Sequence, residues 1–179
     1  LSLTSNTETD VDFAVGKNNH IMRIFNFLCS KFRLMAIWFG NPQLEDAVGM
    51  KKDTLLESLG IEIIEITERS LIGTMPVDKR TVQPYGILHG GASVSLAETL
   101  GSVAAHLSID SSKYYAVGME VNANHLRPAT SGNVIGTATP VHIGNNSHVW
   151  SISIKDEDDR LVCISRLTLA IISKDRIKR

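Results

Sequence analysis

The 179-residue sequence contains few cysteines, only Cys29 and Cys163, and they form no CxxC pair. The sequence therefore predicts neither a fold held together by disulfides nor a zinc site with cysteine ligands. The sequence also has no apolar run near the roughly 20 residues that a membrane-spanning helix needs. We therefore expect neither a membrane anchor nor a metal centre.

The sequence also lacks a strong excess of positive or negative charge. The 18 Lys and Arg residues nearly balance the 19 Asp and Glu residues, and the formal net charge is −1. Nothing in this balance predicts a nucleic-acid partner. The GxSxG, P-loop, dinucleotide and HExxH patterns are absent as well, which removes several common enzyme classes. With 43% hydrophobic residues, the composition is that of an ordinary globular domain, and we expect it to be cytoplasmic.

Residues 1–34 differ from the rest of the chain, and we interpret them as an N-terminal extension outside the fold. The first 12 residues are polar and acidic, whereas residues 13–44 lack Asp and Glu. A targeting segment is the alternative, because such segments are basic, amphipathic and poor in acids. The acidic start argues against it. We expect one domain, residues 35–179.

The hydrophobic pattern of residues 35–179 predicts an α+β fold. A long helix is expected over Gly90–Leu107, because its apolar residues recur at helical spacing. We expect Asn41-Pro42 to start a short helix and a second one to span Lys52–Leu59. No helical pattern separates the last four predicted strands, so the sheet should be mainly antiparallel. The predicted strands are 61–67, 69–76, 114–127, 134–143, 148–155 and 161–172.

Glu98 is the only Asp, Glu, Lys or Arg between Gly86 and Ile109. A helix that is apolar or small nearly all round is usually buried, so this carboxylate should be partly buried too. Burial raises the pKa of a carboxyl group and makes it a better base. The alternative is that Glu98 lies on a solvated stripe. The residues alone leave the two interpretations about even.

The start of the same helix, His89-Gly90-Gly91, is the second unusual feature. The first N–H groups of a helix are unpaired and carry the positive end of its dipole. Glycine lets a ligand approach that backbone closely. The segment could therefore stabilise developing negative charge, as an oxyanion site does. The alternative is an ordinary turn into a helix.

These residues resemble the hotdog-fold acyl-CoA thioesterases, in the group that hydrolyses 4-hydroxybenzoyl-CoA and 1,4-dihydroxy-2-naphthoyl-CoA. The resemblance is carried by the segments 83–93, QPYGILHGGAS, and 96–99, LAET, and by the segments 122–128, NANHLRP, and 165–168, SRLT. It extends over about residues 35–172. It implies a hotdog fold, in which a curved antiparallel sheet wraps one long helix.

The resemblance also implies a set of roles. The residue matched by Gln83 lies near the thioester, while His89 and the Gly90 N–H match the groups that polarise its carbonyl. Glu98 matches the nucleophile or general base, which comes from the neighbouring subunit, and Ser102 matches a hydroxyl near the attacking group. A homodimer or homotetramer with sites between subunits is therefore expected, and no cofactor beyond the coenzyme A substrate.

Coenzyme A needs cations or amides around its phosphates. Our candidates are His125, Arg127, Gly144, Asn145 and Arg166, although an Arg near a strand end is more often solvated or paired with an acid. The expected activity is hydrolysis of an aromatic or medium-chain acyl-CoA, as in menaquinone biosynthesis. The alternatives are a non-catalytic acyl-CoA-binding module and a hotdog hydratase or dehydratase. The sequence leaves open whether Glu98 forms a covalent anhydride or activates water.

Overall fold

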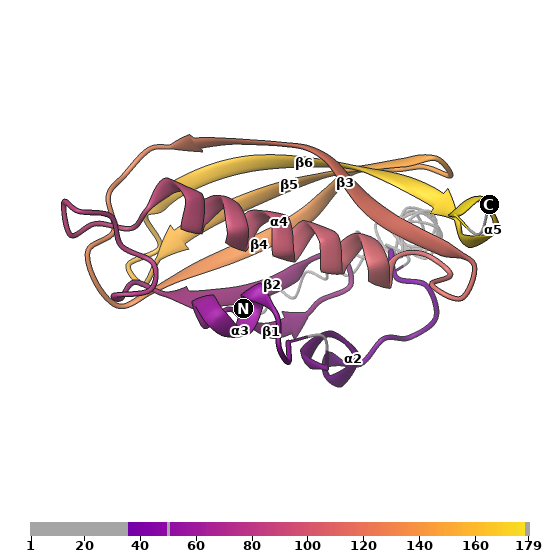
Figure 1. Ribbon diagram of the computed structural model, residues 1–179, viewed down its shortest axis with the longest axis horizontal. Coiled ribbons are helices and arrows are strands. Elements are labelled where there is room, and N and C mark those ends of the chain that lie inside the picture. The colour runs from indigo at the N-terminus through magenta and orange to yellow at the C-terminus, as the bar shows by residue number, and fades with distance from the viewer. Residues whose placement is uncertain (1–35, 50, 178–179) are drawn as a thin grey trace, which may run out of the picture. The chain divides into compact units, whose positions relative to one another are not determined.

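The computed structural model describes residues 36–49 and 51–177, which form one sheet and the helices around it (Figure 1). The predicted extension, residues 1–34, lies outside these described residues, so its boundary stays a prediction. Within the part that the structure describes, none of the helices is long and apolar enough to cross a membrane.

The six strands form a single sheet in the order β1-β2-β4-β5-β6-β3, and all neighbouring pairs are antiparallel. The predicted antiparallel α+β architecture is therefore confirmed. Among the described strands, β1 and β3 lie at the two edges, and β3 pairs with β6 alone. The strands span Glu62–Ile66 (β1), Leu71–Pro76 (β2), Tyr114–His125 (β3), Asn133–Ile143 (β4), Ser147–Asp156 (β5) and Leu161–Ser173 (β6).

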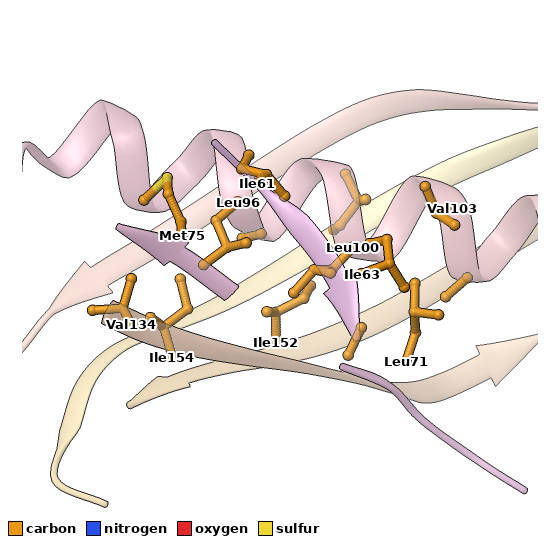
Figure 2. Packing of buried hydrophobic residues seen from close by; sticks show 14 of the residues in the cluster. Ile61, Ile63, Leu71, Met75, Leu96, Leu100, Val103, Val134, Ile152 and Ile154 are labelled. Atoms are coloured by element: carbon orange, nitrogen blue, oxygen red, sulfur yellow. The ribbon is translucent and has the colours of Figure 1, made fainter. Parts of the chain in front are cut away.

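The long helix α4 spans Gly90–Leu107, the range that the apolar periodicity predicted. It lies across one face of the sheet (Figure 1). Leu96 and Leu100 are fully buried between the helix and the strands. Figure 2 shows them meeting inward-facing residues of β2, β4 and β5, such as Met75, Val134 and Ile152. Burial of this apolar surface is the main force that holds α4 on the sheet.

Two strand glycines bring α4 close to the sheet. A Cβ built on Gly136 would lie 2.5 Å from Leu100 Cδ1, and one on Gly73 would lie 2.7 Å from Leu100 Cδ2. The leucine therefore fills the space that these two positions leave empty. This close contact fixes the height of α4 over the sheet and, with it, the positions of the side chains that the helix carries.

Three short helices complete the described part: α2 (Leu44–Val48), α3 (Leu55–Leu59) and α5 (Lys174–Ile177). The prediction that Asn41-Pro42 starts a helix was wrong, because Gln43 is the N-cap of α2. The Gln43 backbone N–H donates to Asp46 Oδ2 at 2.8 Å, and the Asp46 N–H donates to the Gln43 backbone carbonyl at 3.1 Å. The predicted helix over 52–59 is shorter than expected and ends at Gly60, whose φ of 70° is left-handed.

Candidate active site

The start of α4 is built by a tight turn in the loop before it. Gln83 donates its backbone N–H to the Ile87 carbonyl at 2.9 Å, and Gly86 takes a left-handed φ of 74° within this turn. The backbone N–H of His89 then bonds the Thr81 carbonyl at 2.8 Å. These bonds hold the first turn of α4 at a fixed place beside the end of β3 (Figure 1).

His89 is the N-cap of α4. Its Nδ1 accepts a hydrogen bond from the Gly91 N–H at 2.8 Å. With Nδ1 used as an acceptor, a neutral imidazole carries its proton on Nε2, which is then a free donor. The Gly90 N–H makes no hydrogen bond with any of the described residues. The helix therefore begins with two donors, one from a side chain and one from the backbone, available to a ligand.

A cavity of about 370 Å³ opens beside this helix start. It is lined by polar side chains from three segments, together with apolar residues of the same loops. The first group is Gln83, Ser93, His125 and Arg127, and the second is Ile87, Leu88, Leu126, Pro128 and Val162, with Gly90 between them. The structure thus brings four of the predicted site residues together in one cavity: Gln83, Gly90, His125 and Arg127.

His125, the last residue of β3, lies directly over Gly90. A Cβ built on Gly90 would be 2.8 Å from His125 Nε2, so any larger residue at position 90 would collide with the ring. This contact is a stronger reason for glycine at position 90 than the earlier argument that glycine lets a ligand approach the backbone.

Glu98 lies two turns further along α4 and is half-buried. Burial raises the pKa of its carboxyl group, while a hydrogen bond from the Ser102 side chain lowers it; the burial effect is the larger. The predicted direction of the Glu98 pKa shift is therefore confirmed, and the predicted neighbour Ser102 lies where the sequence placed it.

Sequence reasoning missed the residue that Glu98 faces. A Cβ built on Gly118 of β3 would be 2.5 Å from Glu98 Oε1. The register between β3 and β6 shifts between Gly118 and Glu120, which is a β-bulge. An isolated glycine within a strand pattern is the signal of such a bulge or close approach, and could have identified this position.

Gly144, Asn145 and Arg166 lie outside this cavity. Gly144 and Asn145 belong to the β4–β5 turn, at the other end of β5 from His125, more than about 20 Å away along the strand. Arg166 is exposed on the sheet face opposite α4, because its neighbour Leu167 is the one that packs against Gly101 of the helix. These three residues share a site with His89 only if it includes a second copy of the chain.

No three His, Cys, Asp or Glu side chains within residues 36–49 and 51–177 come together in a way that could hold a metal ion. Cys163 is fully buried in β6, as expected for a core residue, and burial raises the pKa of its thiol.

Comparison with known proteins identifies a family whose chemistry is consistent with this site. The model of the thioesterase superfamily matches residues 85–163. The 1,4-dihydroxy-2-naphthoyl-CoA hydrolase of Escherichia coli is 47% identical over 136 residues, which cover 76% of this chain and 99% of that protein. Other relatives, with up to 56% identity, are named as esterases without a stated substrate.

Solved structures agree. A Pseudomonas aeruginosa thioesterase has a TM-score of 0.75 and 47% identity, over 76% of this chain and 99% of that one. A Staphylococcus aureus thioesterase, 39% identical with a TM-score of 0.65 over 67% of this chain and 99% of that one, was solved with a glutamate changed to alanine. It was also solved with a glutamine changed to alanine, at the separation that Gln83 and Glu98 have here. The chain therefore belongs to the thioesterase superfamily and is a thioester hydrolase with the hotdog fold.

Proposed function

We propose that this thioester hydrolase acts on an aromatic acyl-CoA, of the 1,4-dihydroxy-2-naphthoyl-CoA type, in a site shared by two copies of the chain. The observation that carries the proposal is the arrangement along α4. The helix has free donors at its first turn and a half-buried carboxylate of raised pKa at Glu98. Such a pair suits attack on a carbonyl whose oxygen becomes negative.

One chain alone cannot complete this arrangement. Gly90 and Glu98 are eight residues apart on one straight helix, which separates them by about 12 Å along its axis. A carbonyl held at Gly90 is therefore out of reach of the same chain's Glu98. A second copy, with its α4 antiparallel to the first, would place its own Glu98 at that carbonyl.

The edge strand β3 is the surface that we propose for this dimer. It has twelve residues and pairs with β6 on one side, and no other strand of the described residues covers its second side. Val117 and Met119 are 43% and 67% exposed. A long edge strand with exposed apolar residues is a liability unless it is covered. Antiparallel pairing of two β3 strands would cover it and bring Gly118, which contacts Glu98, to the interface.

The mechanism follows from these positions. The thioester oxygen accepts hydrogen bonds from the Gly90 N–H and from His89 Nε2, and both bonds strengthen as charge develops on it. In the general-base route, Glu98 of the second copy takes a proton from water, and the water oxygen attacks the carbonyl carbon. The tetrahedral intermediate then collapses, the carbon–sulfur bond breaks, and the coenzyme A thiolate leaves and is protonated. In the covalent route, the Glu98 carboxylate attacks the carbonyl carbon and expels the coenzyme A thiolate, and water then cleaves the resulting anhydride to the free acid and Glu98.

The cavity beside Gly90 suits the coenzyme A arm. Its apolar wall fits the hydrocarbon parts, and Gln83 provides an amide near the thioester. Arg127 lines the same cavity and can bind a phosphate, whereas His125 lies at its thioester end, over Gly90. The aromatic acyl group is supported by the substrate named for the E. coli relative.

A panel of acyl-CoAs, assayed by release of free thiol, tests the substrate. We expect the highest kcat/KM with hydroxylated aroyl-CoAs; a clear preference for long aliphatic chains would contradict the proposed substrate class. If the wild-type protein binds acyl-CoA but releases no thiol, a non-catalytic binding module would replace the enzyme assignment.

Subunit complementation tests the shared site. Glu98→Gln and His89→Ala are each expected to be nearly inactive alone. When the two are unfolded together and refolded as mixed dimers, one site in each mixed dimer has both wild-type residues, so part of the activity should return. No recovery in mixed dimers that are confirmed by mass spectrometry would place both groups in one subunit.

A further inference from the structure

Ser93 has a buried hydroxyl group with no partner among the described residues. The residue is only 2% exposed, and it lines the cavity beside Gly90. The completely enclosed side-chain polar atoms without a partner in this part of the chain are His148 Nδ1 and Trp150 Nε1. Because Ser93 is one of the residues that line the cavity, and no hydrogen bond to another described residue occupies its Oγ, we infer that this hydroxyl serves the cavity.

The position of Ser93 places this hydroxyl next to the oxyanion donors. It lies three residues after Gly90, so the two share a helix face and are about 4.5 Å apart along the axis. His125 closes the cavity over Gly90, while Leu88 and Val162 contribute apolar wall. Ser93 is therefore a neutral donor and acceptor in the wall of the cavity, beside apolar neighbours.

We propose that Ser93 binds the amide of the thiol arm that lies nearest to the thioester sulfur. This inference rests on the proposed function. In coenzyme A that amide is two methylene groups from the sulfur, so it follows the reacting carbonyl into the cavity at short range. An amide that leaves water for an apolar wall needs a hydrogen-bond partner, and a hydroxyl serves either its N–H or its C=O. Arg127, which lines the same cavity, remains available for the more distant phosphates.

Three benzoyl thioesters test the proposal with the full-length protein: benzoyl-CoA, the N-acetylcysteamine thioester, which keeps this amide, and the ethanethiol ester, which has none. Ser93→Ala should lose about five- to tenfold in kcat/KM with the first two substrates, the size expected for one lost hydrogen bond. With the ethanethiol ester it should equal the wild type. The loss should appear in KM, because the contact is the same in the ground and transition states.

Ser95→Ala is the matched control. Ser95 is two residues further along the same helix, and its hydroxyl bonds the Gly91 carbonyl at 2.9 Å instead of facing the cavity. This variant should keep wild-type kinetics with all three substrates. The melting temperature of Ser93→Ala should not fall, because alanine is the better helix former and no hydrogen bond within the described chain is lost.

The outcomes separate the two proposals. An unchanged Ser93→Ala, or an equal loss with all three thioesters, would overturn the role of Ser93 while leaving the hydrolase intact. A lower melting temperature with uniform loss would assign Ser93 to the structure of the helix. Failure of the wild-type protein to hydrolyse any of the three aroyl thioesters would instead refute the proposed substrate class, and the Ser93 inference with it.

Discussion

The two ends of α4 are built in opposite ways. At its C-terminal end, the carbonyls are satisfied by the chain itself: Phe39 donates its backbone N–H to the Leu107 carbonyl at 2.8 Å, and Ser108 Oγ donates to the Ala104 carbonyl at 2.7 Å. At the N-terminal end, the Gly90 N–H has no partner among the described residues and Gly90 lines the cavity, while the exposed His89 ring uses only its Nδ1 within the helix start. One end is closed by hydrogen bonds and the other is left open.

The difference separates stability from chemistry within one helix. The first N–H groups of any helix lack partners within the helix, and the one at Gly90 stays open to a ligand or to water, while those of Gly91, Ala92 and Ser93 bond His89. The closed end supplies the stability that the open end lacks. Trp38 stacks on the buried Trp150, with ring centroids 6.2 Å apart, and donates its Nε1–H to the Thr67 carbonyl at 2.6 Å.

The largest effect is expected from Glu98→Gln, which keeps the shape of the side chain and removes its basicity. Hydrolysis of an aroyl-CoA should fall at least about a hundredfold in kcat, the low end for a positioned acid–base group. Binding of substrate should survive. A turnover number near the wild-type value would remove Glu98 from the reaction.

The same variant has a pH signature. The pKa of Glu98 is raised in the folded protein, so the folded state favours the protonated carboxyl, and this contribution to stability is lost as pH rises through that pKa. Glu98→Gln should therefore be at least as stable as the wild type at pH 8. In the wild type, the acid limb of the kcat profile should lie above the ordinary glutamate range, and Ser102→Ala should move it further up. Melting curves and pH–rate profiles measure both.

Trp38→Ala removes packing at the closed, C-terminal end of α4. The variant loses an aromatic stack and a hydrogen bond, and its free energy of unfolding should fall by about 2–4 kcal/mol. Trp38→Phe, which keeps a ring for stacking, should lose only about 1 kcal/mol. Both should keep the wild-type kcat at temperatures where they remain folded. A loss of kcat in folded Trp38→Phe would show that the closed end also controls the chemistry.

Substitutions at the two caps of α4 should give smaller effects, one on kcat and the other on the free energy of unfolding. His89→Asn retains a good N-cap side chain but has no ring N–H, so kcat should fall about ten- to a hundredfold with little change in stability. Ser108→Ala should lower the free energy of unfolding by about 1 kcal/mol and leave kcat unchanged. Chemical denaturation and steady-state kinetics on the same preparations would expose the reverse pattern, which would contradict the division between the two ends.

How far the sequence predicts this molecule depends on how local each feature is. The bounds of α4 were predicted correctly because its apolar spacing is repeated over five turns and its neighbours break the pattern. The strand ends were predicted to within about two residues, as expected when turns are read from composition. The start of α2 was missed because its N-cap is Gln43, held through its backbone N–H by the Asp46 carboxylate, and glutamine is an uncommon N-cap.

Features that depend on distant segments could not be read this way. Nothing local in Tyr114–His125 indicates that this strand pairs with β6 at the sheet edge, far from the strand that follows it in sequence. For the same reason the contact between Gly118 and Glu98, and the cavity that Ser93 shares with His125, appear only in the structure. The candidate residues could be named from the sequence, while their grouping into a cavity could not.

The smallest effect is expected from His148, which lies near the closed end and is 1% exposed. The Nδ1 atom of its ring has no partner among the described residues. Protonation of His148 would add a buried N–H without an acceptor, close to a second imidazole, that of His142. Burial first, and then His142, therefore lower the pKa of His148 below its ordinary value of 6.5. Because the folded pKa is depressed, the stability that neutral His148 contributes is complete above pH 6.5 and is lost as pH falls through the folded pKa.

His148→Gln cannot be protonated, so its melting temperature should fall less between pH 7.5 and pH 5 than that of the wild type. His142→Gln, which removes only the exposed neighbour, should give a smaller change in the same direction. Equal pH dependence in His148→Gln and the wild type would show that the buried imidazole stays neutral at no cost, with its Nδ1 satisfied by a trapped water.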